Sequence, residues 1–202
     1  SIYPMPAVAS RNVPALPMVD LYAGAGGLSL GLDRAGFDPI LAVEYLVNAC
    51  ETYADLHPGT PLDAGRPIED VDFRPFRGEV ALLAGGPPCQ PFSTGGKQLG
   101  ESDERDGFPQ YLRALRAIRP DAFLIENVAG LASPSMAGYF DSLLDALCAE
   151  GYHVSWDVLN AADYGVPQKR RRLFIVGMRH TFFEFPDATH RSEEPRLNSS
   201  HT

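Results

Sequence analysis

Short apolar runs alternate with amphipathic stretches along most of the chain. The apolar runs, which predict strands, are residues 17–22, 39–44, 80–84, 122–125, 152–159 and 173–177. The amphipathic stretches, which predict helices, are residues 28–35, 46–56, 110–118 and 136–150. Strands that alternate with helices are typical of βαβ units. The pattern therefore predicts an α/β fold with a mostly parallel sheet and helices on both of its faces.

Weaker signals mark the edges of this fold. Residues 63–70 predict a short strand or a loop, and the last two apolar runs flank a polar stretch, which predicts an antiparallel pair at the sheet edge. Residues 1–16 are rich in proline, whereas residues 187–202 are polar and show no periodicity. We therefore expect one domain over residues 17–186, with a lead-in before it and a loose tail after it.

The composition agrees with a globular protein. Of the 202 residues, 45% are hydrophobic and 21% are charged, which is enough to bury a substantial core. No apolar run approaches the roughly 20 residues that span a membrane, and the first residues lack the order of a secretory signal. We therefore expect an intracellular protein with no membrane partner.

The three cysteines are widely spaced. Disulfide frameworks and zinc sites need clustered cysteines, so neither a disulfide nor a metal site is expected. Cys50 and Cys148 lie in apolar, helical stretches, where a small buried side chain is the usual role of cysteine. Cys89 instead lies in Gly-Gly-Pro-Pro-Cys-Gln, directly after a predicted strand. The prolines restrict its backbone, which favours a preorganised, reactive thiol.

A carboxylate follows the next predicted strand. Glu126 ends the apolar run 122–125. Because the carboxyl ends of neighbouring parallel strands meet at one edge of a sheet, we expect Cys89 and Glu126 to lie at the same rim. By itself Glu126 is more typical of a helix cap. Beside a thiolate nucleophile, however, a carboxylic acid suits addition to an electron-poor ring.

A glycine turn follows the first predicted strand, in the segment from Asp20 to Gly27. Glycine lets the backbone approach a bound cofactor closely, although such turns are also common in ordinary strand–helix connections. Glu44, at the end of the second predicted strand, is placed to accept hydrogen bonds from both hydroxyls of a ribose. Together these features predict a nucleotide-like cofactor over the first two strands.

The net charge of −9 is unfavourable for a protein that binds nucleic acid, but the basic residues are clustered. Four consecutive basic residues begin at Lys169. In an extended segment, alternation places Gln168, Arg170 and Arg172 on one side and Lys169 and Arg171 on the other. Two arginines that face one site can hold a base edge, a carboxylate or phosphates. A solvated surface is the more common role of a basic run, and alternation favours the site.

Taken in order, these motifs resemble the cytosine-5 DNA methyltransferase family over about residues 17–186. The matching elements are the glycine turn at 20–27, Glu44, Asp63, Pro88-Cys89-Gln90, Glu126-Asn127-Val128 and Gln168-x-Arg170-x-Arg172. The resemblance implies a Rossmann-like fold that uses S-adenosylmethionine, with double-stranded DNA as the partner and methylation in restriction–modification as the setting. It also implies a location at the nucleoid in a bacterium, and otherwise in the cytoplasm.

The resemblance assigns roles to individual residues. Cofactor contacts would come from Tyr22, Gly24, Gly26, Gly27, Glu44, Tyr45, Asp63 and Pro88. In this assignment Glu44 binds the ribose, Tyr45 packs on the adenine and Asp63 bonds to the adenine amino group. Catalysis would rest on Cys89, Glu126, Arg170 and Arg172. Substrate contacts and a lid formed by residues 90–108 would involve Gln90, Ser93, Lys97, Arg105 and Gln168.

The family chemistry agrees with the residue types. Carbon 5 of cytosine is a weak nucleophile, so the thiolate of Cys89 would first add to carbon 6 and make carbon 5 reactive toward the sulfonium methyl group. Glu126 would bond to ring nitrogen 3 and to the exocyclic amine. The target atom is hidden in a duplex, so the base would be flipped out.

The chain also departs from the family pattern. A target-recognition region and a final cofactor-completing segment normally follow the Gln-x-Arg-x-Arg strand, and neither is visible here. We therefore expect the catalytic domain to need a separate recognition fragment or subunit. The alternatives are a non-catalytic cofactor-binding remnant or regulatory subunit and a tRNA cytosine-5 methyltransferase. A nicotinamide-dependent oxidoreductase would leave Cys89, Glu126 and the arginines without roles.

Overall fold

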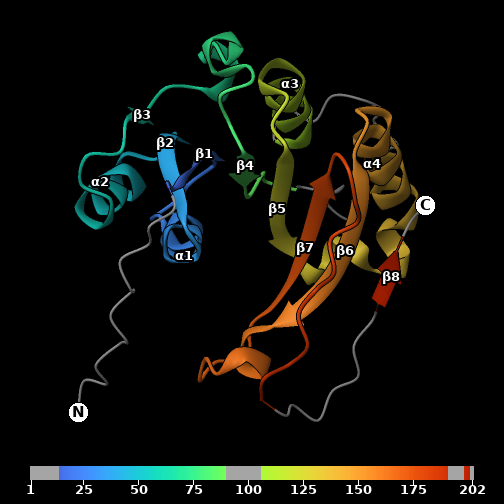
Figure 1. Ribbon diagram of the computed structural model, residues 1–202. Helices are drawn as coiled ribbons and strands as arrows, with labels where there is room; N and C mark the ends of the chain where they lie inside the picture. The colour runs from blue at the N-terminus through green and yellow to red at the C-terminus, as the bar shows by residue number, and fades with distance from the viewer. Residues whose placement is uncertain (1–13, 90–105, 191–197, 201–202) are drawn as a thin grey trace, which may run out of the picture.

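A computed structural model describes residues 14–89, 106–190 and 198–200, and these residues form an eight-stranded sheet with the order β3-β2-β1-β4-β5-β7-β6-β8 (Figure 1). The strands are β1 (Leu16–Leu21), β2 (Phe37–Glu44), β3 (Leu62–Ala64), β4 (Leu82–Gly85), β5 (Ala122–Val128), β6 (His153–Asn160), β7 (Arg171–Met178) and β8 (Asn198–Ser200). Strands β1 to β5 are parallel, whereas β7 is antiparallel to both β5 and β6. The expected mostly parallel sheet with an antiparallel pair is confirmed.

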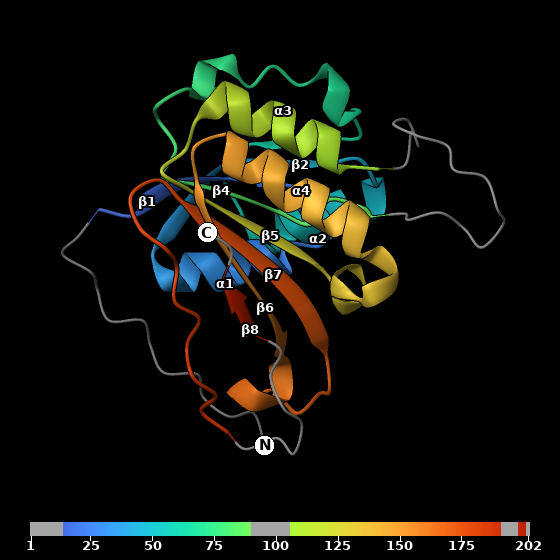
Figure 2. The same ribbon diagram turned by 90° about the vertical axis from the view of Figure 1, so that its right-hand side faces the viewer.

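Among the described residues, four α-helices cover the two faces of the sheet. They are α1 (Gly27–Ala35), α2 (Val47–Leu56), α3 (Phe108–Ile118) and α4 (Ala137–Ala149). Short 3-10 helices occupy connections at Ile68–Asp70, Arg74–Phe76, Ala129–Ala132, Pro134–Met136 and Ala161–Tyr164. Figure 2 shows α3 and α4 side by side over one face, with α1 on the other side. Within the described residues, no helix is long and apolar enough to cross a bilayer.

Side chains that alternate along β1 pack against helices on both faces of the sheet. Val19 and Leu21 face the main core, where they are buried with the side chains of α3 and α4. Met18, on the opposite face, packs with Leu28 and Leu32 of α1. Burying apolar side chains on both faces contributes roughly 1.5–3 kcal/mol for each fully buried one. The apolar run at 17–22 thus becomes a central strand of the sheet.

Two strands extend further into polar sequence than expected. Strand β5 was expected to end at Ile125 but continues to Val128, and β7 begins at Arg171 rather than at Leu173. The reason is their mutual pairing, since Glu126 lies opposite Phe174 and Val128 lies opposite Arg172. Backbone pairing does not require apolar side chains, so hydrophobic pattern alone places the ends too early.

The expectation of a loose tail is wrong for two parts of residues 187–202. Residues Asn198–Ser200 form β8, which pairs antiparallel with β6 and makes it an inner strand. Thr189 and His190 donate backbone hydrogen bonds to the carbonyl of Asp163, at 3.0 and 2.9 Å. These contacts are made mainly by backbone atoms, and hydrophobic periodicity does not report them.

Candidate active site at the carboxyl ends of the strands

A cavity of about 610 Å³ lies at the carboxyl ends of β1, β4 and β5 and extends along the β6–β7 hairpin. Ligands of open α/β sheets bind at this edge. Among the residues that line the cavity are six that the sequence assigned to the site, namely Tyr22, Gly24, Gly27, Glu126, Arg170 and Arg172. The cavity therefore joins the predicted cofactor turn to the predicted acid and its arginines.

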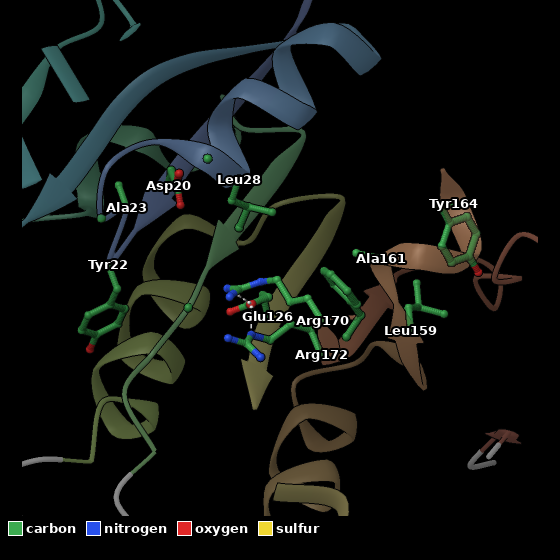
Figure 3. A pocket seen from close by; sticks show the side chains of 14 residues that line it. Asp20, Tyr22, Ala23, Leu28, Glu126, Leu159, Ala161, Tyr164, Arg170 and Arg172 are labelled. Carbon is green, nitrogen blue, oxygen red and sulfur yellow. Dashed lines mark ion pairs between the residues drawn. The ribbon is translucent and has the colours of Figure 1, made fainter. Parts of the chain in front are cut away.

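Glu126 forms the centre of a charged cluster in this cavity. Its Oε1 atom lies 2.9 Å from Nε of Arg172 and 3.7 Å from Nη2 of Arg170. Figure 3 shows the two guanidinium groups on either side of the carboxylate. Both arginines point to one side of the hairpin, as the alternation predicted. Gln168 is exposed and does not line the cavity.

The glycine turn is supported on one side by His57, the residue that follows α2. Gly26 has a φ of 87°, and a side chain there would meet the ring of His57 at 2.8 Å, so glycine is required on both grounds. The same ring lies 3.0 Å from the carbonyl of Gly26, through its Nε2 atom. Gly26 therefore supports the turn from below, while Gly24 and Gly27 line the cavity.

Glu44 fastens the turn from the neighbouring strand. Its carboxylate accepts hydrogen bonds from the backbone N–H groups of Gly24 and Leu46, at 2.8 and 2.7 Å. An ionised carboxylate offers about four acceptor positions, so these two bonds leave room for a ligand hydroxyl. Glu44 is buried and does not line the cavity. In this structure it links the turn to the start of α2.

Tyr45 and Asp63 lie near the same end of the sheet as Glu44. Asp63 is in β3, paired with Val43, and its carboxylate forms an ion pair with Arg66. The side chain of Tyr45 is 62% exposed, and the two apolar residues that follow it are similarly exposed (Leu46 64%, Val47 61%). Three exposed apolar side chains in succession make this edge suited to cover a flat ring. Neither Tyr45 nor Asp63 lines the cavity.

Asp20 is a cavity residue to which the sequence assigned no role. It is fully buried, and Oδ2 accepts a hydrogen bond of 2.6 Å from the hydroxyl of Ser29. Its other oxygen, Oδ1, has no partner among the described residues. Burial raises the pKa of Asp20 to about 6, although the hydrogen bond from Ser29 opposes this shift. The signal in the sequence was an acidic residue inside an apolar strand.

Replacing Asp20 with asparagine is expected to stabilise the folded chain at pH 8. The pKa is higher in the folded than in the unfolded chain, so the penalty is absent below about pH 3.8 and complete above about pH 6. A shift of about two units corresponds to up to about 3 kcal/mol. Urea unfolding at pH 4 and pH 8 measures the difference.

The matched control is Asp38→Asn, which removes an exposed carboxylate from β2 and should change stability little at either pH. An Asp20→Asn effect of equal size at pH 4 and pH 8 would contradict the electrostatic explanation. A buried charge that costs stability is typical of functional sites, where a ligand supplies the missing partner.

Tyr22 links the glycine turn to the residue before α3 through a hydrogen bond. Its backbone φ of 57° is unusual for a residue other than glycine and costs of order 1–2 kcal/mol. Its hydroxyl donates a hydrogen bond of 2.9 Å to the carbonyl of Gly107. The N–H of Gly107 in turn donates to the carbonyl of Pro88, at 2.9 Å. Pro88 is exposed and does not line the cavity.

Cys89 lies at the expected rim but not in the cavity. The side chain of Asn127, beside Glu126 in β5, donates a hydrogen bond of 2.8 Å to the carbonyl of Pro87, which ties the two strand ends together. The thiol is half-buried, packs on the main core and is not a cavity-lining group. Burial, and then the charge of Asp106, raise the pKa of Cys89 to about 11. A thiol whose pKa is raised is a weaker nucleophile at neutral pH than the reactive thiol expected from the sequence.

The remaining predicted residues lie outside the described part of the chain. These are Gln90, Ser93, Lys97 and Arg105, with most of the predicted lid. The structure adds a cavity wall that the sequence did not indicate, formed mainly by the β6–β7 hairpin. Its side chains are those of Leu159, Ala161, Tyr164 and Phe174. Their residue types do not indicate a functional site in the sequence. The pairing of β6 with β7 brings them to the cavity.

Comparison with known proteins agrees with this site. A family model described as C-5 cytosine-specific DNA methylase matches residues 16–202. The Type II methyltransferase M.NgoMIV of Neisseria gonorrhoeae is 40% identical over 88% of this chain and 57% of its own length. M.NaeI of Lentzea aerocolonigenes is 41% identical over 87% of this chain and 43% of its own length. The chain thus spans about half the length of these relatives.

Three further proteins extend the match. M.AquIA of Picosynechococcus sp. is 37% identical over 86% of this chain and 76% of its own length. A candidate DNA modification methyltransferase encoded in an Escherichia coli prophage has a TM-score of 0.67 at 30% identity, over 81% of this chain and 47% of its own. Spodoptera frugiperda DNMT2, at 24% identity over 89% of this chain and 54% of its own, shares the fold with a TM-score of 0.68. The chain belongs to the C-5 cytosine-specific DNA methylase family.

Proposed function

We propose that this chain is the catalytic part of a DNA cytosine-5 methyltransferase that uses S-adenosylmethionine. The observation that carries the proposal is that the glycine turn and Glu126 with its two arginines line the same cavity, at its two ends. A methyl donor and a cytosine must meet in one place, and this cavity offers a surface for each.

The residues at the turn fit the cofactor. S-adenosylmethionine carries an ammonium and a sulfonium charge, and the unpartnered oxygen of Asp20 supplies a negative counterpart in the cavity wall. The carboxylate of Glu44 retains free acceptor positions for ribose hydroxyls. When bound, the cofactor supplies an electrophilic methyl group. The turn would hold it and keep water away from that group.

The other end of the cavity fits a cytosine. Cys89 lies at the rim of the strand ends rather than in the cavity wall, so its thiolate would approach the base from the rim. It would form a bond to carbon 6, which moves an electron pair to carbon 5. Glu126 would hydrogen-bond to nitrogen 3 and to the exocyclic amine, with its carboxylate oriented by Arg172 and Arg170. After methylation a base would remove the proton on carbon 5, and the sulfur–carbon bond would break. Cys89 would then return as the thiolate.

DNA is the proposed substrate, and a recognition region in a partner polypeptide or further segment is the proposed partner. The chain spans about half the length of its relatives, so transfer assays need the remaining part. In these assays the remaining part is supplied as a separate, complementing polypeptide. Tritium transfer from labelled S-adenosylmethionine to DNA then tests the proposed function. The cytoplasm is the proposed location.

Tyr45→Ala is expected to raise the dissociation constant for S-adenosylmethionine about tenfold. An aromatic side chain stacked on adenine contributes about 0.5–1.5 kcal/mol beyond its burial, and 1.4 kcal/mol is a factor of ten. Because Tyr45 is 62% exposed, its loss should leave the melting temperature unchanged. Isothermal calorimetry with the cofactor measures the affinity.

Leu56→Ala serves as the control for Tyr45→Ala. It removes an apolar side chain that is 47% exposed, at the far end of α2 from Tyr45. The affinity of this control should equal that of the wild type. If both variants bind the cofactor as the wild type does, Tyr45 does not contact the adenine.

A further inference from the structure

Contacts of Gly107 bring the start of α3 next to Pro88 and Tyr22. Gly107 donates a backbone hydrogen bond to the carbonyl of Pro88 and accepts one from the hydroxyl of Tyr22, both at 2.9 Å. A side chain on Gly107 would meet Cδ of Pro88 at 2.5 Å and the ring of Tyr22 at 3.0 Å. Only glycine allows this approach. Asp106 is therefore held close to Cys89, although neither the proposed chemistry nor the sequence gave Asp106 a role.

The carboxylate of Asp106 has a defined orientation. Oδ2 accepts a hydrogen bond of 2.7 Å from the hydroxyl of Tyr139 in α4, and Oδ1 accepts one of 3.0 Å from the N–H of Phe108. The rings of Phe108 and Tyr139 meet edge to face, with centroids 6.2 Å apart. Both oxygens are thus engaged by groups on α3 and α4, which fixes the charge in place.

We propose that Asp106, oriented by Tyr139, is a positioning residue that fixes a negative charge beside Cys89 and slows the reactions of its thiol. Among the described residues, the titratable groups that interact with the thiol are Asp106, which precedes α3, and Tyr139 of α4. Asn127, which ties β5 to Pro87, is neutral. A protonated cysteine is a poor nucleophile and a slow target for oxidation. The charge would therefore slow oxidation of the Cys89 thiol while no cytosine is bound.

The ionisation of the thiol supports this geometry. The pKa of Cys89 is raised to about 11, first by burial and second by the charge of Asp106. Removing the charge should therefore reverse less than half of the shift. Because alkylation rates below the pKa follow the thiolate fraction, a shift of up to one unit changes the rate by up to about tenfold.

The test is the rate of alkylation of Cys89 by iodoacetamide between pH 7 and pH 10, followed by peptide mass spectrometry on the full chain. Asp106→Asn is expected to react about three to ten times faster than the wild type at pH 8. Tyr139→Phe, which frees the carboxylate to turn toward water, should give a smaller increase. In the wild type, 1 M salt should raise the rate, whereas in Asp106→Asn it should not.

A second cysteine in the same chain provides the control. Cys148 has its pKa raised by burial and by Asp145, so Asp145→Asn should accelerate alkylation of Cys148 and leave Cys89 unchanged. Equal alkylation of Cys89 in wild type and Asp106→Asn, both folded by circular dichroism, overturns the proposal. If Asp106→Asn does not fold, an unchanged rate in Tyr139→Phe together with no salt effect in the wild type overturns it.

The inference takes from the proposed function only the role of Cys89 as the nucleophile. Alkylation reports on the thiol itself, without cofactor or DNA. Tritium transfer to DNA reports on the proposed function separately. A chain that transfers no methyl group but shows the Asp106 effect would refute the proposed function alone, and the opposite result would refute this inference alone.

Discussion

Cys89→Ser is expected to lower methyl transfer by at least about 10⁴-fold, because a serine hydroxyl is a far weaker nucleophile than a thiolate and removal of a covalent nucleophile typically costs this much or more. The substitution is nearly isosteric at a half-buried position, so the fold should be kept. Binding of S-adenosylmethionine should also be unchanged, since Cys89 does not line the cavity. Tritium transfer with the complementing polypeptide measures the rate, and calorimetry measures the binding.

Cys148→Ser is the matched control for Cys89→Ser. Cys148 is also partly buried, in α4, and has no place in the proposed chemistry. This control is expected to keep the wild-type rate within about twofold, as surface-near substitutions usually have small effects. If Cys89→Ser retained more than a hundredth of the activity, the covalent mechanism would be wrong for this chain.

Glu126→Gln is expected to lower the turnover number by about 10²–10³-fold, the usual cost of removing one group that stabilises a developing charge. Glutamine keeps the shape but loses the charge that holds Arg172 at 2.9 Å and Arg170 at 3.7 Å. It also cannot exchange a proton with nitrogen 3. The apparent KM for DNA should change much less than the turnover number, because the interaction strengthens in the transition state.

A second carboxylate–arginine pair separates this effect from the general loss of an ion pair. Glu150 accepts a hydrogen bond of 2.6 Å from Nε of Arg116. Neither residue lines the cavity. Glu150→Gln should leave turnover unchanged. A loss of turnover in Glu150→Gln as large as in Glu126→Gln would point to stability rather than chemistry.

The layered α/β fold was predictable because the hydrophobic pattern reports which side chains are buried. The apolar run before the glycine turn became β1, and the antiparallel pair expected from residues 152–159 and 173–177 became β6 and β7. Polar strand ends were not predictable in the same way. Glu126 and Arg172 lie inside paired strands, because the β5–β7 ladder continues past the last apolar residue.

The charged cluster was predictable in part. Alternation along the basic run placed Arg170 and Arg172 on one side, and the structure brings both to Glu126. Pairing of β6 with β7 also brings Leu159 and Phe174 to the same cavity. The sequence pattern does not distinguish these two residues from core residues.

The surroundings of Cys89 were the least predictable feature. The prolines around it indicated a rigid and reactive thiol, but reactivity depends on neighbours that come from elsewhere in the chain. Asp106, which precedes α3, acts on the thiol through its charge, and Tyr139 of α4 donates a hydrogen bond to Asp106. The sequence shows that Asp20 is an acidic residue in an apolar strand. It does not show whether the carboxylate has a hydrogen-bonding partner, so the unpartnered oxygen could not be predicted.

Covalent trapping tests most directly whether Cys89 is the nucleophile. The chain, its complementing polypeptide and S-adenosylmethionine are incubated with duplex DNA that carries 5-fluorocytosine, whose carbon 5 cannot release a proton. The expected result is a one-to-one protein–DNA adduct in denaturing mass spectrometry, with the DNA attached to the Cys89 peptide, and no adduct with Cys89→Ala. An adduct that persists in Cys89→Ala, or no adduct from a wild-type mixture that methylates ordinary DNA, would contradict the mechanism.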